Sequence, residues 1–451
     1  MKEKEIKFTE GSIFRPLIRF TTPIFFSLLL QCLYGAVDLV VVGQFAQSDS
    51  ISAVATGSQI AHVLLMIISG LSMGTTILLG QKIGAKKFDE AGSVVGTTIA
   101  LYCIVIALVT IFMSGFATQI AKLVNAPERA FIPTVDYIRI TGLGAVFLIG
   151  YNVFGAIFRG IGDSKTPLFA VIIATILNIA GDLFLVGVCG MGAKGAAIAT
   201  VFAQALSVVI SVVIAKKHGF PFDFTRKDIY LNKNMTALIV KLGAPIAIQN
   251  GLIQISFLAI TAIINVFGVT ISAGVGITER MISFLMLSQI SFGESLAAFV
   301  AHNVGAQKYN RATKSLIITI IVSVSISIII AFIAFFHGKW LLQIFTTDKN
   351  VLAASYEYLQ VYSFDIVSTA LLFCFIGYFN GFGKTRFNMW HGIIGSLFVR
   401  IPLSYVFAQK VPFSLFLIGA AIPISSGVQD ILCIIYFIYL QRKTVNKKQY
   451  L

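Results

Sequence analysis

Long apolar stretches separated by short polar breaks make up almost the whole chain, from Pro16 nearly to the C-terminus. About 20 mostly apolar residues suffice for a helix to cross the hydrocarbon core of a bilayer. The pattern predicts twelve spanning helices, over residues 16–45, 52–80, 93–118, 131–159, 167–189, 194–216, 238–268, 272–302, 314–337, 351–381, 387–408 and 414–440. A membrane β-barrel would instead show alternating segments of about ten residues. The expected fold class is therefore an all-α integral membrane protein.

Composition agrees with lipid as the solvent of this surface. Apolar residues make up 57% of the chain and charged residues 12%, with a mean hydropathy of +0.89. A soluble domain of this composition would expose large apolar patches. The first apolar stretch has no evident small-residue cleavage site, so we expect it to stay as a span rather than to be a signal peptide. The five cysteines lie in apolar segments without the close spacing of a metal or redox motif.

The distribution of positive charge predicts the topology. The formal net charge is +15, and assigning the span ends alternately to two sides places 25 Lys and Arg on the N-terminal side and six on the other. Loops rich in Lys and Arg stay in the cytoplasm. The sequence therefore predicts a multi-pass plasma-membrane protein with both termini cytoplasmic, and the basic excess does not indicate a nucleic-acid partner.

The two halves of the chain share a register. Residues 84–91 (GAKKFDEA) resemble residues 305–312 (GAQKYNRA) at an offset of 221, which also relates Tyr137 to Tyr358, and an offset of 222 relates Pro23 to Pro245. This register predicts a duplication. We expect two six-helix lobes, residues 1–216 and 237–451, joined by a cytoplasmic linker over 217–236. Six spans per half make the repeats parallel, an architecture that favours a transporter with alternating access over a channel or receptor.

Acidic residues inside predicted spans are candidates for function. Inserting a carboxylate at bilayer depth costs at least about 2.5 to 3.5 kcal/mol. Asp38 lies deep in the first span, and Asn178 and Asp182 are four residues apart in the fifth, so the latter two share a helical face. Thr200 and Asn152 can add a hydroxyl and an amide, although either residue can simply hydrogen-bond neighbouring helices. Two carboxylates with neutral oxygens suit a hard monovalent cation, and they can equally hold a shared proton.

The first span also contains Pro23, which removes a backbone hydrogen bond and can bend the helix. Because Pro23 and Asp38 share one helix, loading Asp38 with a proton or metal ion can change the bend. The alternative is a static kink.

The second half lacks the same acidic set. The counterpart of Asp38 falls at the apolar residues 258–260, and the counterpart of the Asn178/Asp182 pair falls at residues 399–403, which include Arg400. We therefore expect ion coupling to be concentrated in the first lobe. Glu294 and Asp365 are secondary candidates, either lining a cavity or pairing with a cation such as Arg280 or Arg400.

No GxxxxGK[ST] phosphate loop is present, so the chain carries no ATPase motif of its own. We expect no enzymatic activity and no cofactor, with transport driven by an ion gradient.

These features together resemble the multidrug and toxic compound extrusion (MATE) family. The resemblance covers essentially the whole chain, through the Pro and Asp of the first span and the segments 80–85 (GQKIGA), 159–167 (RGIGDSKTP) and 302–306 (HNVGA). The family implies antiport of cationic, drug-like molecules against Na⁺ or H⁺. The implied ion-coupling residues, which would be the Na⁺ ligands in a sodium-coupled member, are Asp38, Asn178, Asp182 and Thr200.

The resemblance also implies that Gln31, Tyr137 and Asn152 line the same lobe and that Pro23 is the bending proline. It does not imply a second ion site, because Ile253 and Gln254 stand where some members carry a seventh-helix Glu. The sequence leaves Na⁺ and H⁺ open, and we expect a functional monomer. The alternative functions are a lipid-linked glycan flippase on a similar fold, which should have several Lys or Arg in its cavity, and a channel or receptor.

Overall fold

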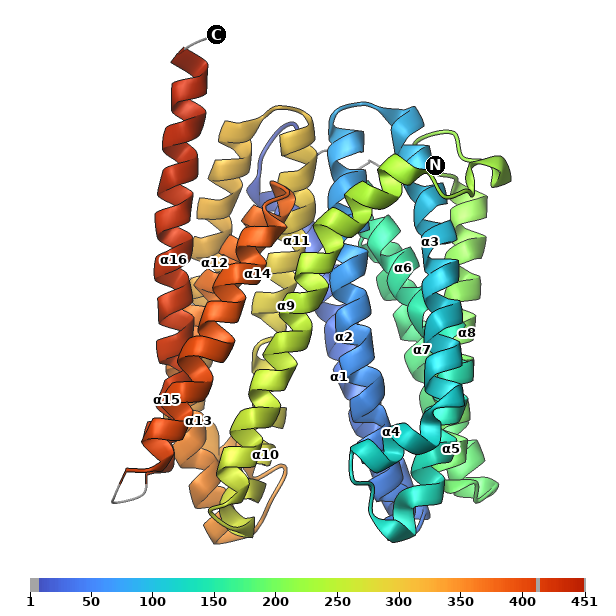
Figure 1. Ribbon diagram of the computed structural model, residues 1–451, viewed down its shortest axis with the longest axis vertical. Coiled ribbons are helices and arrows are strands. Elements are labelled where there is room, and N and C mark those ends of the chain that lie inside the picture. The colour runs from blue at the N-terminus through green and yellow to red at the C-terminus, as the bar shows by residue number, and fades with distance from the viewer. Residues whose placement is uncertain (1–7, 411–413, 450–451) are drawn as a thin grey trace. The chain divides into compact units, whose positions relative to one another are not determined.

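The computed structural model describes residues 8–410 and 414–449, and the regular elements in this part of the chain are helices (Figure 1). They form two compact units, one of residues 1–247 and 301–309 and one of residues 248–300 and 310–451. Within these described ranges, ten helices are long and apolar enough to cross a membrane, or up to twelve when each of two bent pairs is counted as one span. The predicted all-helical membrane fold is confirmed.

Unit 1 contains the first helices of the chain. They are α1 (Phe14–Phe45), α2 (Ser48–Gly84), α3 (Phe88–Gly115), α4 (Ala117–Leu123), η1 (Glu128–Ala130), α5 (Phe131–Leu143), α6 (Ala145–Ile161), α7 (Lys165–Asp182), η2 (Leu183–Val188), α8 (Gly192–His218) and η3 (Arg226–Asp228). The unit also includes the first part of α9 (Lys233–Asn265) and residues 301–309.

Unit 2 begins within α9 and continues beyond it, except for residues 301–309. Its helices are α10 (Val269–Leu285), α11 (Leu287–Gly305) up to residue 300, α12 (Tyr309–Leu342) from residue 310, α13 (Lys349–Gly381), α14 (Thr385–Ile393), η4 (Ile394–Arg400), α15 (Ile401–Ala408) and α16 (Leu415–Gln449). Division into compact units is a different property from sequence duplication, so the lobe boundaries at 216 and 237 stay a prediction. Residues 1–7, the first residues of the predicted N-terminal lobe, lie outside the described residues.

The fourth and eighth predicted spans are broken rather than continuous. The helical run Glu128–Leu143 meets α6 at 50°, and α10 meets α11 at 42°. The first bend falls at Gly144, where an added Cβ would lie 2.3 Å from Val201 Cγ2 of α8. The missing side chain lets α8 pack into the bend. Hydropathy could not reveal either break, because apolar residues continue through both.

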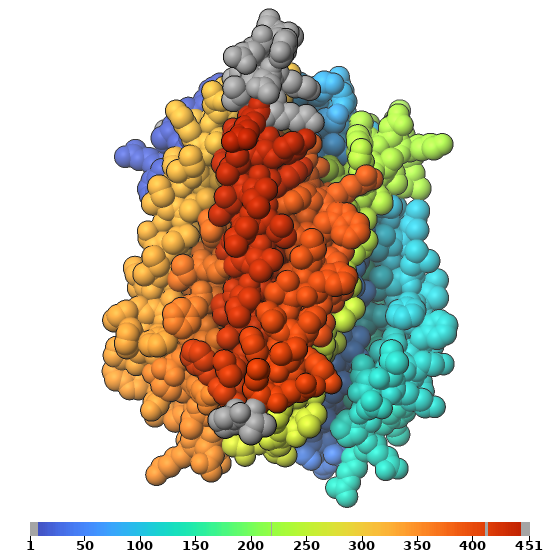
Figure 2. All heavy atoms as spheres, turned by 60° about the vertical axis from the view of Figure 1, so that its left-hand side comes forward, coloured from blue at the N-terminus to red at the C-terminus, as the bar shows by residue number. Residues whose placement is uncertain are grey.

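Side chains on the outer faces of the long helices are apolar, as lipid contact requires. In unit 2, Figure 2 shows α16 in red between α12 and the α14–α15 segment. Exposed residues of these helices include Ile329, Phe332 and Phe336 of α12 and Ile431, Ile435 and Ile438 of α16. This surface fits a multi-span membrane protein.

Two stretches of π-helix interrupt the spans. Leu183–Val188 directly follows Asp182 of α7, and Ile394–Arg400 follows α14. Single π-helical turns inside α-helices occur frequently at functional sites. One of these stretches begins directly after a candidate ion-coupling residue, and the other ends at Arg400.

Candidate functional site

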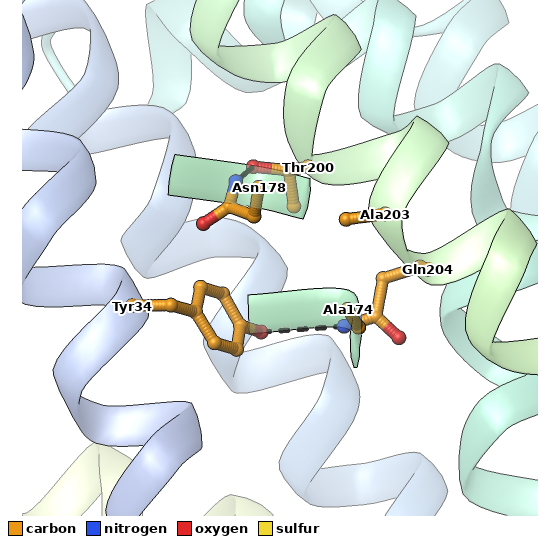
Figure 3. Close-up of a pocket in the computed structure, with 6 residues that line it drawn as sticks. All are labelled: Tyr34, Ala174, Asn178, Thr200, Ala203 and Gln204. Atoms are coloured by element: carbon orange, nitrogen blue, oxygen red, sulfur yellow. Dashed lines mark hydrogen bonds between the residues drawn. The ribbon is translucent and has the colours of Figure 1, made fainter. Parts of the chain in front are cut away.

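Three helices of unit 1 each contribute two polar side chains spaced four residues apart. They are Tyr34 and Asp38 of α1, Asn178 and Asp182 of α7, and Thr200 and Gln204 of α8. Residues at this spacing lie on one face of a helix. Since α1, α7 and α8 pack against one another, the three faces can meet. In Figure 3, Tyr34, Asn178, Thr200 and Gln204 surround one small hollow.

The two carboxylates of this site are buried and close together. Asp38 is 5% exposed and Asp182 is 0% exposed. Their carboxyl groups are close enough to interact directly. With both groups ionised and nothing between them, their negative charges would repel strongly in this low-dielectric environment. A proton or a cation between them would remove that repulsion.

Neutral polar groups surround the carboxylates without saturating them. Thr200 Oγ1 donates to Asp38 Oδ2 at 3.4 Å, and Asn178 Nδ2 donates to Thr200 Oγ1 at 3.5 Å. Both distances exceed the usual range for a hydrogen bond. Asp38 Oδ1, Asn178 Oδ1 and both carboxylate oxygens of Asp182 are buried without a hydrogen-bond partner. Such oxygens are rare in folded proteins unless a ligand, an ion or water satisfies them.

Fixed positive charge does not compensate this acidic pair. Ion pairs among the described residues include those of Lys82 and Lys87 with Glu90, and of Lys194 with Asp136 at 3.1 Å. None of these ion pairs includes Asp38 or Asp182. The buried carboxylates therefore depend on something other than a Lys or Arg ion pair.

Tyr137 of α5 completes one side of the site. It is 3% exposed, and its hydroxyl lies close to Thr200 and within electrostatic range of Asp38 and Asp182. Gly57 of α2 makes this position possible, because a Cβ there would lie 2.3 Å from Tyr137 Cδ1. Because Gly57 has no side chain, the ring of Tyr137 can pack against α2 inside the unit.

Four of the predicted site residues lie together, and several others do not. The structure brings Asp38, Asn178, Asp182 and Thr200 into one cluster. Gln31 and Asn152 hydrogen-bond to other residues, and Glu294 and Asp365 belong to the other compact unit. Gln31 Nε2 donates to Ser27 O at 3.1 Å and to Tyr151 OH at 3.4 Å, while Asn152 Nδ2 donates to Leu148 O of its own helix at 3.0 Å. The hydrogen bond of Asn152 matches the alternative of a structural amide.

Glu294 and Asp365 belong to unit 2, on α11 and α13. Asp365 is 3% exposed, and its Oδ2 accepts a hydrogen bond from Thr369 Oγ1 at 3.0 Å. Neither residue is part of the cluster in unit 1.

Sequence reasoning missed Tyr34 and Gln204. Together with Ala174 and Ala203 they line the hollow, and Gln204 Nε2 lies 3.5 Å from Tyr34 OH. The signal that could have found them is the helical repeat, since Tyr34 precedes Asp38 by four residues and Gln204 follows Thr200 by four.

The donor set suits a hard cation or a proton. Two carboxylates, one amide oxygen and one hydroxyl are oxygen ligands of the kind that hard cations prefer. Among the described residues no group of three or more His, Cys, Asp or Glu is placed to hold a metal ion. The chemistry available here is reversible binding of one small positive charge in a buried setting.

Comparison with known proteins gives a consistent result. The family model described as MatE matches the chain twice, over residues 23–184 and 245–406. The two matches start 222 residues apart, which confirms the duplication. The chain is 24% identical to the probable multidrug resistance protein YoeA of Bacillus subtilis, covering 97% of this chain and 96% of the relative. It is 27% identical to the multidrug export protein MepA of Staphylococcus aureus, covering 86% of each chain.

Solved structures share the fold. One, described as the outward-facing conformation of a multidrug resistance MATE family transporter of the MOP superfamily, superimposes with a TM-score of 0.90 at 20% identity over 96% of this chain and 97% of the other. A second, a crystal structure of MATE in the bent conformation, gives a TM-score of 0.91 at 18% identity over 99% of each chain.

Proposed function

This chain belongs to the MatE family of multidrug efflux transporters, and we propose that it is a secondary antiporter that exports organic cations in exchange for Na⁺ or H⁺. The observation that carries the proposal is the pair Asp38 and Asp182, two buried carboxylates within reach of each other and without a Lys or Arg ion pair in the described chain. Such a pair binds a positive charge that has to come from outside the protein.

The energetics favour reversible ion binding at this pair. Inserting two carboxylates costs together about 5 to 7 kcal/mol at bilayer depth, before their mutual repulsion is added. A bound Na⁺ or proton offsets part of this cost. Each elementary charge that crosses the membrane contributes about 2.3 kcal/mol per 100 mV. One ion per cycle therefore supplies enough free energy to concentrate a solute usefully.

The residues of the site have distinct tasks in the proposed cycle. For Na⁺, oxygens of Asp38, Asp182, Asn178 and Thr200 are the candidate ligands. For H⁺, the proton resides on a carboxylate oxygen of Asp38 or Asp182. In either case the acidic pair loses net negative charge, which weakens its attraction for a cationic drug. Exchange requires only that ion and drug prefer different states of the protein.

Pro23 marks a position at which α1 can bend when the protein changes between its ion-bound and drug-bound states. It lies inside α1 and has no N–H to donate to the carbonyl of Arg19. Ser27 Oγ donates to Pro23 O at 2.9 Å. Because Asp38 is on the same helix, neutralising its charge removes repulsion from Asp182 and shifts the preferred bend of α1. The drug-binding space changes shape with it.

The setting follows from the same proposal. The transporter acts in the plasma membrane with both termini cytoplasmic, works as a monomer on small cationic drug-like molecules, and needs no cofactor beyond the transported ion.

The test is efflux of a fluorescent organic cation from proteoliposomes under an imposed Na⁺ or H⁺ gradient. We expect gradient-driven efflux in the wild type and its loss in Asp38→Asn. The matched control is Asp136→Asn, which makes the same chemical change at a carboxylate that already pairs with Lys194; it should transport like the wild type. If neither gradient moves the cation, the antiporter proposal is wrong and a lipid-linked glycan flippase becomes the leading alternative.

A further inference from the structure

The segment between α8 and α9, residues 219–232, packs against α3 within unit 1 (Figure 1). The contact is made at Gly92 and Gly96, which lie four residues apart and so share one face of α3. A Cβ at Gly92 would lie 2.9 Å from Asp223 O, and a Cβ at Gly96 would lie 1.9 Å from Asp228 O. The backbone of the segment therefore rests directly on the backbone of α3 at two points, and a side chain at either glycine would displace it.

Contacts within the segment fix its shape. Phe222 is buried, and its ring stacks on Phe220 with 5.4 Å between the ring centroids. Asp228 Oδ2 accepts hydrogen bonds from the backbone N of Thr225 at 2.7 Å and from its Oγ1 at 2.9 Å, which caps the turn η3. Asn232 Oδ1 accepts from Asn234 N at 3.0 Å at the start of α9. The exposed side chains of the segment are thus held in a defined arrangement.

The contact with α3 lies where the apolar part of that helix begins. Asp89 and Glu90 are in its first turn, and no charged residue follows them as far as Gly115. Gly96 lies beyond Glu90 by about 9 Å, at a rise of about 1.5 Å per residue. The polar interfacial layer of a bilayer is about 5 to 8 Å thick on each side. The segment therefore reaches the boundary between lipid headgroups and hydrocarbon.

Apolar and basic side chains are exposed together on this segment and at its two ends. Three consecutive apolar residues follow η3, with exposed fractions of 40% for Ile229, 51% for Tyr230 and 48% for Leu231. Five exposed basic residues flank them in the sequence, and no ion pair of the described residues includes any of the five, which are Lys216, Lys217, Arg226, Lys227 and Lys233. The acidic residues of this stretch are Asp223 and Asp228, and Thr225 already occupies the Asp228 carboxylate.

We propose that residues 216–233 form a binding surface for the headgroups of anionic phospholipids. Ile229, Tyr230 and Leu231 enter the interfacial layer, where tyrosine is favoured, and the basic side chains bind phosphodiester groups. Arg226 and Lys227 are central, because η3, which carries them, is the part docked on α3. A linker that only met water would gain nothing from three consecutive exposed apolar residues at this depth. The surface concerns the lipid and does not depend on which ion drives transport.

Lipid titration of the purified full chain in neutral detergent tests the proposal. Phosphatidylglycerol should raise the melting temperature, because a ligand of the folded state stabilises it, and phosphatidylcholine should do so much less. Each Lys or Arg near an anionic surface contributes about fivefold in affinity. Arg226→Gln/Lys227→Gln should therefore raise the half-saturating concentration of phosphatidylglycerol roughly thirtyfold.

The matched control is Lys122→Gln/Arg129→Gln, which removes the same two charges from exposed positions of unit 1 on the side predicted to be extracellular. It should leave the half-saturating concentration unchanged. An equal shift in the two double variants, or no shift in Arg226→Gln/Lys227→Gln, would overturn the proposal. So would equal stabilisation by phosphatidylcholine, or by glycerol phosphate, which would assign the surface to a soluble phosphate instead.

Fluorescence quenching tests the depth of the segment separately. The sequence has two tryptophans, Trp340 and Trp390, so Trp340→Phe/Trp390→Phe provides a silent background for Tyr230→Trp. In nanodiscs both membrane faces are open to added quenchers. Phospholipid brominated in the upper part of its acyl chains should quench the new fluorophore, and aqueous iodide should quench it little. Strong quenching by iodide without quenching by the brominated lipid would show that the segment stays in water and would overturn the proposal.

Discussion

Replacing Thr200 with valine should weaken binding of the coupling ion about fivefold while leaving the fold intact. Valine matches the shape of threonine but lacks the hydroxyl. In the structure Thr200 Oγ1 donates to Asp38 Oδ2 at 3.4 Å and accepts from Asn178 Nδ2 at 3.5 Å. The substitution therefore removes one candidate ion ligand together with both of these hydrogen bonds.

The magnitude follows from the geometry. A hydrogen bond to a charged group contributes about 1.5 to 3 kcal/mol at ordinary distances. Both hydrogen bonds of Thr200 are longer than the ordinary donor–acceptor distance. We therefore expect the substitution to lower the ion-binding free energy by only about 1 kcal/mol. Since about 1.4 kcal/mol corresponds to a factor of ten, this loss corresponds to a roughly fivefold higher half-saturating ion concentration. The maximal efflux rate should change less, because saturating ion restores occupancy.

The assay is the ion dependence of drug efflux in proteoliposomes, fitted for half-saturation and maximal rate. Thr175→Val is the matched control. Thr175, on α7, is buried like Thr200, but its Oγ1 donates to Val171 O of its own helix at 2.8 Å. It should leave the half-saturating concentration unchanged. Equal half-saturation in wild type and Thr200→Val, or an equal shift in both valine variants, would refute the role given to this hydroxyl.

Two further substitutions test other parts of the structure. Gly84→Ala should lower the melting temperature by several degrees, because its Cβ would lie 2.0 Å from His302 O, whereas Gly115→Ala, with nothing within 4 Å, should change it little. Pro23→Ala restores a backbone donor inside α1 and should reduce gradient-driven efflux at least about tenfold in a well-folded protein; undiminished coupled efflux would show that the bend of α1 plays no part in the cycle.

The spans and the duplication could be predicted because they depend on local properties of the chain. The length of an apolar stretch identifies a spanning helix whatever its neighbours are. The duplication is visible because similar residues recur at a constant offset along the chain. The acidic candidates Asp38 and Asp182 could also be found, since a carboxylate in an apolar stretch is costly wherever it points. The sequence likewise placed Arg400 at the counterpart of the Asn178/Asp182 pair.

Tertiary structure alone decided which of these residues meet. The number of residues per helical turn places Tyr34 on the same face as Asp38, and Gln204 on the same face as Thr200. It does not determine how α1 and α8 are rotated about their axes. Packing against α7 sets those rotations and turns both faces to one hollow, while Asn152 bonds to its own helix. The bend at Gly144 is equally non-local, because it depends on Val201 of another helix. A periodic pattern reports what lies along one helix, and only the packing of several helices determines what lies across from it.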